Sequence, residues 1–473
     1  MKSESKLVNE SRQNDSFTDN GAVTHSTSLS NLVDFFFIAG TLMQKSSEEY
    51  LPLWNRAFAE DKTLAMRLLF WMRDVRWWAW VRDAFRTIYS SLSQEDKKHY
   101  SKYISEYWRW DDLIQLYKSD SESFKDIILA QFKNKDSNTF GLFCKWFPRK
   151  GFVFHSIRKE LGLDAKEMRD LIVSNTKVVE QLMSAKKWSE IKYNTVPAKA
   201  FNIYKKSFEK NDESRFNDFI KRKPELIKSW TLYPYELYKS FQKWDRKDII
   251  DQQWKNLPNY ISGNKSFLPV VDVSGSMESC RWTIKPMDVS VSLWVYLSER
   301  NRSIFKDAFI TFSEKPKMEY LQWTATQRFQ QLYNAEWWYN TNLEAVFDLI
   351  LDTAKRENLK QEDMPEYLII LSDMEFDRAT LRYDEKWYLY NSVPNYKSIK
   401  QKYDAAWYLK PNIVFWNLNW RIGNVPVSFD EHATALISGF SPAIMKSILG
   451  TDILTPEWVM LFTLNSQRYS VIN

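Results

Sequence analysis

Three short oxygen-bearing side chains stand at the end of an apolar segment in the second half of the chain. Asp272, Ser274 and Ser276 alternate along Asp-Val-Ser-Gly-Ser, after the run that begins at Phe267. Residues at i, i+2 and i+4 of an extended segment point to the same side, so one carboxylate and two hydroxyls can converge. Hard cations take oxygen ligands of this kind. The pattern predicts a site for Mg²⁺, or for Mn²⁺ or Ca²⁺, although Asp and Ser also follow strands simply as turn formers or helix caps.

The elements that must position this site alternate between strand and helix patterns. The alternation predicts an α/β domain with a mostly parallel, doubly wound sheet covered by helices on both faces. Ligands of such sheets bind at the carboxyl ends of the strands. The expected strands are 267–273, 307–312, 367–371, 412–418 and 434–437, and the expected helices are 287–299, 343–355, 398–407 and 442–449.

Two later loops supply further oxygen donors in the same order as a known cation site. Thr341 lies in Asn-Thr-Asn-Leu-Glu-Ala-Val, and Asp373 ends Tyr-Leu-Ile-Ile-Leu-Ser-Asp. With the DxSxS pattern, these segments resemble the metal-ion-dependent adhesion site of von Willebrand factor A domains, over about residues 263–473. The resemblance implies a Rossmann-like domain in which all five side chains hold the cation, which keeps one position for an acidic protein ligand. Trp337 and Trp338 depart from the pattern, because a small residue is expected before the threonine.

The first half of the chain carries helix patterns. Residues 1–28 are polar and predict a disordered tail, and residues 29–262 predict an α-solenoid of HEAT-like helical repeats. The domain boundary is expected near residue 262, after Pro234 and Pro258 interrupt the helical pattern. The expected helices include 63–75, 81–92, 95–108, 111–117, 121–132, 165–172, 176–183 and 197–208.

The end of the helical region is basic. Residues 141–262 contain 25 Lys and Arg against 15 Asp and Glu, whereas the whole chain has a net charge of only +6. Such an imbalance is typical of a phosphate-binding surface, and interleaved Trp146, Phe152, Phe154 and Trp188 could stack on unpaired bases of structured or single-stranded RNA. The alternative is an ordinary solvated helix face with aromatic residues in the core. The candidate contacts are Lys145, Arg149, Lys150, Arg158, Lys159, Lys186, Lys187, Lys192, Lys205, Lys206, Lys221, Arg222 and Lys223.

Helical repeats followed by an adhesion-type domain resemble the Ro ribonucleoprotein class, whose TROVE module binds RNA. The phrases 69–76, 286–289, 309–313 and 340–346 are more similar to an uncharacterised family of plant and viral proteins with that architecture. The resemblance implies an RNA-binding, metal-dependent scaffold of ribonucleoprotein type. The alternative is a purely protein-binding adaptor, in which the basic surface meets an acidic protein.

Catalytic patterns are missing from the sequence. The four histidines are scattered, and no P-loop or GxSxG elbow occurs, so we expect a protein that is not an enzyme. A metal-dependent phosphoesterase is the weaker alternative. Two cysteines, no signal peptide and no long apolar run predict a cytoplasmic protein without a membrane partner.

The balance of glycine and tryptophan is unusual. The chain has 10 glycines and 22 tryptophans, whereas ~7% glycine is typical of globular chains. Several tryptophans stand where a turn favours glycine, as in Arg-Trp-Trp-Ala-Trp at 76–80 (Trp77, Trp78, Trp80) and Trp-Trp-Tyr-Asn at 337–340. Only glycine reaches positive φ without steric cost. Our hypothesis is that some of these codons are read as glycine in the source, and the alternative is an authentically tryptophan-rich protein.

Overall fold

Helices and one mixed sheet make up two compact units. The computed structural model describes residues 16–473 apart from 19–21, 76–80, 136–138, 177, 262, 264, 279–283, 313–315, 322, 334–341, 377–394 and 420–423. The α/β unit comprises Met1–Ala65, Tyr233–Trp254 and Pro258–Ser470, and the helical unit comprises Met66–Leu232, Lys255–Leu257 and Val471–Asn473. The expected multidomain α and α/β architecture is thus confirmed, but the units do not divide at a single boundary near residue 262.

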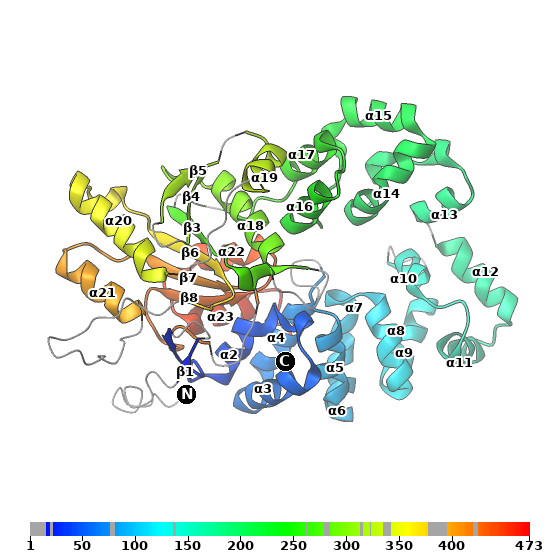
Figure 1. Ribbon diagram of the computed structural model, residues 1–473. Helices are drawn as coiled ribbons and strands as arrows, with labels where there is room; N and C mark the ends of the chain where they lie inside the picture. Colours follow the sequence, from blue (N-terminus) through cyan, green and yellow to red (C-terminus); the bar gives the residue numbers. More distant parts are fainter. Residues whose placement is uncertain are drawn as a thin grey trace. The chain divides into compact units, whose positions relative to one another are not determined.

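A six-stranded sheet forms the centre of the α/β unit (Figure 1). All neighbouring pairs are parallel except β4 and β5. Helix α18 packs against β3, β4 and β6, while α2 and α23 pack against β8. The five strands that the sequence predicts are all present. The strands, in spatial order, are β5 (Met318–Tyr320), β4 (Ala308–Thr311), β3 (Phe267–Val271), β6 (Tyr367–Ser372), β7 (Asn412–Asn417) and β8 (Thr434–Ser438).

Strand β3 tolerates a proline in the middle of the sheet because of where that residue faces. The Asp272 N–H donates to Leu371 O of β6, and Val271 O accepts from Phe312 N on the β4 side. Backbone groups of alternate residues face opposite neighbours, so Pro269 turns its missing N–H toward β4. Pairing of β3 with β4 begins only at Val270. The proline thus lies where the β3–β4 ladder begins, while the pairing of β3 with β6 is unbroken, and β3 stays buried along its whole length.

The remaining elements of the α/β unit are two short N-terminal strands and the helices that precede, separate and follow the sheet strands along the chain. They are β1 (Ser16–Phe17), β2 (Val23–Thr24), α2 (Asn31–Ala39), η1 (Leu42–Gln44), α3 (Ser47–Glu60), α16 (Pro234–Gln242), α17 (Lys247–Lys255), η6 (Gly275–Glu278), α18 (Pro286–Arg300), α19 (Ala325–Tyr333), α20 (Leu343–Glu357), η7 (Gln361–Asp363), α21 (Asn395–Ala405), η8 (Pro442–Ile444), α22 (Met445–Leu449) and α23 (Pro456–Leu464).

The N-terminal segment belongs to the α/β unit. Strands β1 and β2 pair antiparallel, and His25 forms an antiparallel bridge with Val425. The Thr18 hydroxyl, which is 5% exposed, donates to Phe376 O over 2.7 Å. The prediction of a disordered tail through residue 28 is therefore wrong for the described residues from 16 onward, because their hydrogen bonds to the C-terminal domain offset the cost of ordering a polar segment.

Helix α2 is held against the sheet by a close backbone approach. The Gly40 N–H donates to the Ser438 hydroxyl over 2.9 Å, and that hydroxyl donates to Phe36 O over 3.1 Å. A Cβ atom on Gly40 would lie 2.3 Å from Gly439 Cα, so only glycine fits there. Gly439 has a φ of 102°. Two glycines 399 positions apart thus join the N-terminal segment to the last strand.

Helix α16 also joins the α/β unit, although the sequence places residues 233–254 in the helical region. Helix α16 packs against α18. The rings of Tyr238 and Trp254 contact Phe329 of α19 edge-on, with centroids 5.0 and 5.1 Å apart. These aromatic contacts bury an apolar face that the sequence alone could equally assign to a helical repeat.

The helical unit consists of short helices and single helical turns (Figure 1). Its interior contains an ion pair between the fully buried Arg73 and Asp112, 2.8 Å apart, to which Arg86 adds a second contact of 2.8 Å. Expected helix 95–108 is divided into α6, η2 and α7. The elements are α4 (Lys62–Arg73, at the junction), α5 (Asp83–Ser91), α6 (Gln94–Tyr100), η2 (Ser101–Tyr103), α7 (Ile104–Tyr107), α8 (Trp110–Ser119), α9 (Ser121–Lys133), α10 (Phe140–Trp146), α11 (Phe152–Glu160), α12 (Ala165–Asn175), α13 (Val179–Ser184), η3 (Trp188–Glu190), η4 (Tyr193–Thr195), α14 (Ala198–Asn211), α15 (Glu213–Arg222) and η5 (Pro224–Leu226).

Three of the tryptophans that the structure describes adopt left-handed backbone conformations. Trp244, Trp323 and Trp407 have φ values of 56°, 78° and 61°. Their side chains are 82%, 66% and 96% exposed, so burial of the indole does not compensate the strain. These positions favour glycine on backbone grounds, as the hypothesis of glycine codons expects. The segments 76–80 and 337–340, on which that hypothesis was first raised, lie outside the described residues.

In the described part of the chain, no helix is both long enough and apolar enough to cross a membrane.

Candidate metal centre

The topology of the sheet brings Asp272 and Asp373, two of the predicted cation ligands, to one edge. Strands β3 and β6 are parallel neighbours, with Val271 beside Leu371. The next residues, Asp272 on one strand and Ser372 and Asp373 on the other, therefore lie at the same carboxyl edge. Chain order reverses between β3 and β6, since β4 follows on one side and β7 and β8 on the other. Such a switch point is where open α/β sheets bind ligands.

Hydrogen bonds fix the carboxylate of Asp272 on both sides. The Ser274 N–H donates to its Oδ1 over 2.9 Å, and the Ser372 hydroxyl donates to its Oδ2 over 2.6 Å. The Ser274 and Ser276 hydroxyls lie 2.9 Å apart, which places the two oxygens of the DxSxS loop side by side. The short helix η6 begins immediately after Ser274 and turns the chain back at this point. The structure thus brings Asp272, Ser274 and Ser276 together.

Two buried carboxyl groups at this edge lie close enough to interact electrostatically. Asp272 and Asp373 are both 0% exposed. Burial and, second, the negative charge of Asp373 raise the pKa of Asp272 to about 7. Ionising both groups in a low-dielectric site is costly unless a positive charge compensates them. Two carboxylates beside two hydroxyls are a donor set suited to a hard divalent cation, so the residues fit a Mg²⁺-class ion.

Thr341, the fifth expected ligand, and the departing residues Trp337 and Trp338 lie outside the described residues. Among the residues that are described, no group of three or more His, Cys, Asp or Glu side chains forms a metal cluster. A site built from two carboxylates and hydroxyl oxygens does not require such a group. The centre therefore rests on four described side chains.

Glu375 is a third buried acidic side chain near the site that the sequence analysis did not single out. It is 2% exposed, and its N–H donates to Asp373 Oδ1 over 3.3 Å. Its own carboxylate accepts a hydrogen bond from the Asn424 side-chain amide. Met374 between them has a φ of 67°, and its N–H donates to the Ser372 hydroxyl over 3.0 Å. The Asp-Met-Glu order was the available signal, and a tight turn directs both acidic side chains inward.

The structure separates the predicted RNA contacts of the helical unit into surface and interior positions. Lys205 is 4% exposed and donates to Asn202 Oδ1 over 2.7 Å, so its prediction as a surface contact is wrong. Arg158 donates to Leu163 O over 2.8 Å, at the end of α11. Lys145 is half-buried and lies 3.1 Å from Glu180. The exposed residues of the predicted set are Arg149, Lys150, Lys159, Lys186, Lys187, Lys192, Lys206, Lys221, Arg222 and Lys223.

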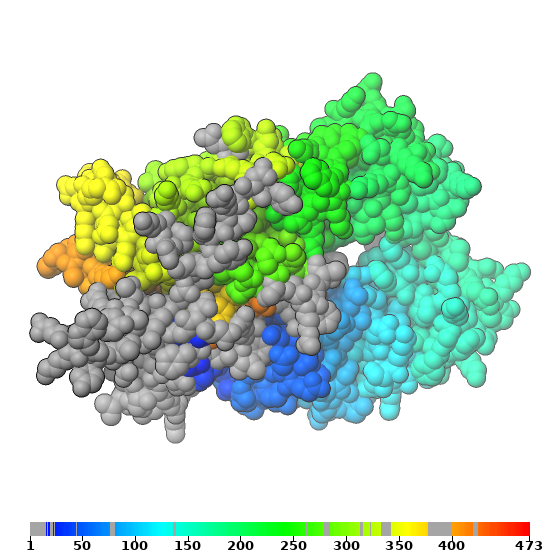
Figure 2. Space-filling view, viewed as in Figure 1, coloured from blue at the N-terminus to red at the C-terminus, as the bar shows by residue number. Residues whose placement is uncertain are grey.

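Ion pairs and aromatic packing limit the set further. Lys187 lies 3.1 Å from Glu190, and Arg222 lies 2.6 Å from Asp218. Phe154 is 1% exposed and belongs to the core, whereas Phe152 is 61% exposed. Helices α14 and α15, which carry Lys206 and Arg222, lie on the visible surface of the helical unit (Figure 2, green). The basic side chains remain scattered over several short elements.

Two families of uncharacterised domains match the chain. Residues 266–463 match "Domain of unknown function (DUF7788)", and residues 154–265 match "Domain of unknown function (DUF2828)". The chain is also similar to "Uncharacterized protein L728" of Acanthamoeba polyphaga mimivirus, with 26% identity over an alignment 522 positions long that covers 95% of this chain and 87% of the viral protein. The two family matches meet at residues 265 and 266, close to the boundary expected from the sequence.

Proposed function

We propose that this protein is an RNA-binding, cation-dependent scaffold of ribonucleoprotein type. In this proposal the α/β unit is a von Willebrand factor A-like domain that recruits an acidic protein ligand, and the helical unit is a TROVE-like repeat module that holds RNA. Neither role requires catalysis.

The observation that carries the proposal is the pair of fully buried carboxyl groups, Asp272 and Asp373, at the switch point of the sheet. A structural role alone gives no reason to bury two acids beside each other at the edge where such sheets bind ligands. Asp272 is held from both sides by Ser274 and Ser372, so its orientation is set before any ligand arrives. A bound Mg²⁺-class ion would supply a coordination position for a partner carboxylate.

The RNA-binding role rests on charge. The exposed Arg149, Lys150, Lys159 and Lys206 belong to a segment with a net charge of +10. Exposed cations that neutralise phosphates release counterions, so the affinity for RNA falls as salt rises, with a slope of roughly −0.7 per phosphate contact on a single strand. A purely protein-binding adaptor would use the same surface for an acidic protein.

A charge-reversal experiment separates these roles. Arg149, Lys150, Lys159 and Lys206 are changed together to Glu, and the matched control changes four exposed cations of the α/β unit, Lys306, Arg356, Lys360 and Lys400. Fluorescence anisotropy then measures the affinity of a labelled single-stranded uridine 12-mer between 50 and 200 mM salt. We expect the first variant to bind about 100-fold more weakly with a flatter salt slope, and the control to bind nearly as wild type. Wild-type protein that does not retain the RNA at 50 mM salt contradicts the RNA-binding role and leaves the adaptor.

A further inference from the structure

A pocket in the helical unit is lined by apolar side chains that the surrounding helices do not fully bury. It has a volume of about 640 Å³, within the ~300–1,000 Å³ of ordinary ligand sites. Helix α13, which forms one wall, has no buried residue although it carries Val179 and Leu182. On the opposite wall, Leu142 of α10 is 54% exposed. A group of neighbouring apolar side chains is normally buried away from water, so the pocket walls favour a ligand with an apolar body.

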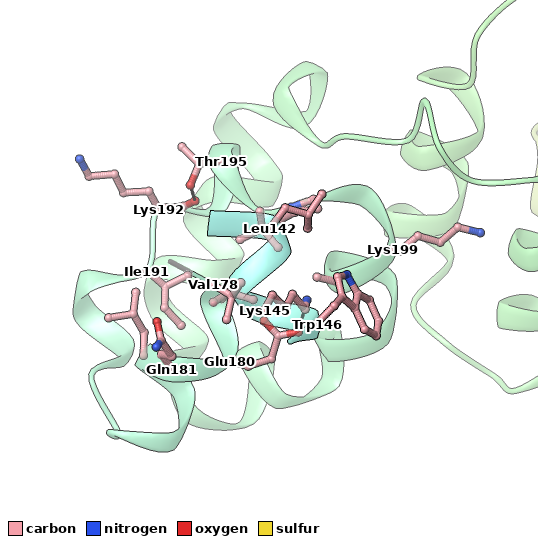
Figure 3. Close-up of a pocket in the computed structure, with 15 residues that line it drawn as sticks. Leu142, Lys145, Trp146, Val178, Glu180, Gln181, Ile191, Lys192, Thr195 and Lys199 are labelled. Atoms are coloured by element: carbon pink, nitrogen blue, oxygen red, sulfur yellow. Dashed lines mark hydrogen bonds and ion pairs between the residues drawn. The ribbon is translucent and has the colours of Figure 1, made fainter. Parts of the chain in front are cut away.

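The floor and rim of the pocket have different chemistry. Val178, Ile191 and Val196 give it apolar surface, and the Trp146 ring lies at its edge with the Arg109 guanidinium 4.2 Å from the ring centroid. Gln181 and Thr195 are neutral polar residues of the lining. The Gln181 amide donates to Val173 O over 3.3 Å, which leaves its carbonyl oxygen as an acceptor, and the Thr195 hydroxyl donates to Lys192 O over 2.8 Å. In Figure 3 the side chains of Lys192 and Lys199 extend away from the cavity on opposite sides. Lysines therefore flank an apolar hollow on two sides.

The carboxylate within the pocket is already paired. Glu180 accepts from Lys145 Nζ over 3.1 Å (Figure 3). It also accepts from the Tyr204 hydroxyl over 3.4 Å. Because Glu180 is paired in this way, it presents little net negative charge to a ligand in the pocket. A ligand that suits this arrangement has a flat, uncharged, weakly polar body and negative charge on both sides of it.

We propose that this pocket binds one unpaired nucleobase of an RNA strand, whose backbone phosphates lie over Lys192 and Lys199. An unpaired base is flat and apolar on its faces, and its edge can donate a hydrogen bond to the Gln181 carbonyl oxygen. A strand that crosses the mouth of the pocket continues in both directions from that base, so backbone phosphates further along it can reach Lys192 on one side and Lys199 on the other. This inference rests on the proposed RNA-binding function and gives it a site that the scattered surface cations do not supply.

A filled-pocket variant tests the inference without removing any charge. Ala200 lines the pocket in the first turn of α14, and Ile203 on the same helix is 69% exposed and is not part of the lining. Ala200→Trp fills the hollow, whereas Ile203→Trp adds an indole to the outer face of the same helix. Thermal unfolding of both variants confirms that each is folded before binding is compared.

Two probes separate base binding from phosphate binding. The first is a labelled single-stranded uridine 12-mer, and the second is a 12-mer of the same sugar-phosphate chain without bases. We expect wild type and Ile203→Trp to bind the uridine 12-mer about tenfold more tightly than the abasic probe, since stacking of one base contributes ~1–3 kcal/mol. Ile203→Trp controls for the addition of an indole to α14. Ala200→Trp should bind both probes alike, at the abasic affinity, because its indole fills the pocket.

The outcomes distinguish this inference from the proposed function. If Ala200→Trp keeps the preference for the uridine 12-mer, the pocket does not hold a base, while RNA binding by the surface stands. If wild type binds neither probe, the proposed RNA-binding function fails and the pocket inference fails with it. A labelled glutamate 12-mer that binds more tightly than RNA and is excluded by Ala200→Trp would overturn the inference in favour of an acidic peptide.

Discussion

The two units differ in how their predicted functional residues are brought together. In the α/β unit, Asp272 and Asp373 lie 101 positions apart in the sequence and are placed at one edge by the register of β3 and β6. In the helical unit, the adjacent residues Lys205 and Lys206 differ completely, one being 4% exposed and the other on the surface. In a parallel sheet, residues that follow the strands are placed together at the carboxyl edge. In a helix, the face on which each basic residue lies decides separately whether it is buried or exposed.

The close approach of Gly40 to Gly439 joins the N-terminal segment to the sheet of the α/β unit. Gly40→Ala should destabilise the protein by about 3 kcal/mol or more, because its Cβ would overlap Gly439 at 2.3 Å. Gly162→Ala in the helical unit is the matched control, because its φ is 67° but open space surrounds it, and should cost about 1 kcal/mol. Urea unfolding measures both. Equal losses would show that the N-terminal segment is not docked on the sheet.

The pH dependence of stability tests the buried acids. Asp272 has a pKa raised to about 7 in the folded protein, against an ordinary 3.8. Between these values the folded state binds the extra proton, so the cation-free protein loses stability as pH rises from about 4 to 7. Asp272→Asn removes this loss, and at pH 8 without divalent cations the variant should be more stable than wild type by about 2 kcal/mol, since each pKa unit corresponds to ~1.4 kcal/mol.

Asp288→Asn serves as the control for a buried acid elsewhere in the same unit. Asp288 is 5% exposed and accepts from the Gln242 amide over 2.9 Å, and burial also raises its pKa. Its variant should therefore retain the wild-type loss of stability that Asp272 causes. Chemical unfolding at pH 5 and pH 8 in the presence of a chelator compares the three proteins. A wild type with equal stability at both values would contradict the electrostatic description of the site.

The neighbouring lysines of α14 sharpen the contrast within the helical unit. Lys205→Ala should destabilise the unit by about 1 kcal/mol, because the buried stem loses its packing. The salt slope of RNA binding should stay unchanged in that variant. Lys206→Ala should leave stability unaltered and reduce the slope by roughly 0.7. The reverse pattern in anisotropy and thermal unfolding would mean that the surface is assigned to the wrong face of the helix.

The smallest expected effect concerns tryptophans with positive φ. Trp407→Gly should stabilise the α/β unit by about 0.5 kcal/mol, because relief of left-handed strain exceeds the entropic cost of glycine. Trp458→Gly is the control, because that residue lies inside α23, where glycine should cost about 1 kcal/mol. Mass spectrometry of the native peptides that contain residues 78 and 407 tests the codon hypothesis directly. An indole mass at both positions removes it.

Much of the α/β fold could be predicted because its strands are buried and apolar. Tyr367–Ser372 is buried throughout and reads clearly in the sequence. Strand β5 could not be predicted, since Met318, Glu319 and Tyr320 are all exposed and carry no alternating pattern. The docking of the N-terminal segment also left no local signal, because it depends on single contacts such as Gly40 with Gly439.

In the candidate metal centre, too, residues next to buried apolar strands could be predicted, whereas those placed by long-range contacts could not. Asp272, Ser274, Ser276 and Asp373 were predictable because each stands at or just after a strand end. Glu375 follows Asp373 by two residues, but this order alone did not single it out, because its burial depends on a turn at Met374 and on Asn424 from a distant loop. In the helical unit, the pocket between α10, α13 and α14 arises from the packing of short helices, and neither periodicity nor charge predicted it.

Under the proposed function, two buried carboxylates at the β3 and β6 strand ends hold a divalent cation. Isothermal titration of Mg²⁺, and of Mn²⁺ in parallel, into chelator-treated protein at pH 7.5 tests it most directly, with wild type, Asp272→Asn and Asp288→Asn compared. We expect one ion bound per wild-type and per Asp288→Asn chain. Binding should be at least 100-fold weaker in Asp272→Asn, because loss of a direct ligand costs more than loss of an outer-shell partner, which weakens metal binding ~10–100-fold. Wild-type protein that binds neither ion, or an Asp272→Asn variant that binds as tightly as wild type, would contradict it.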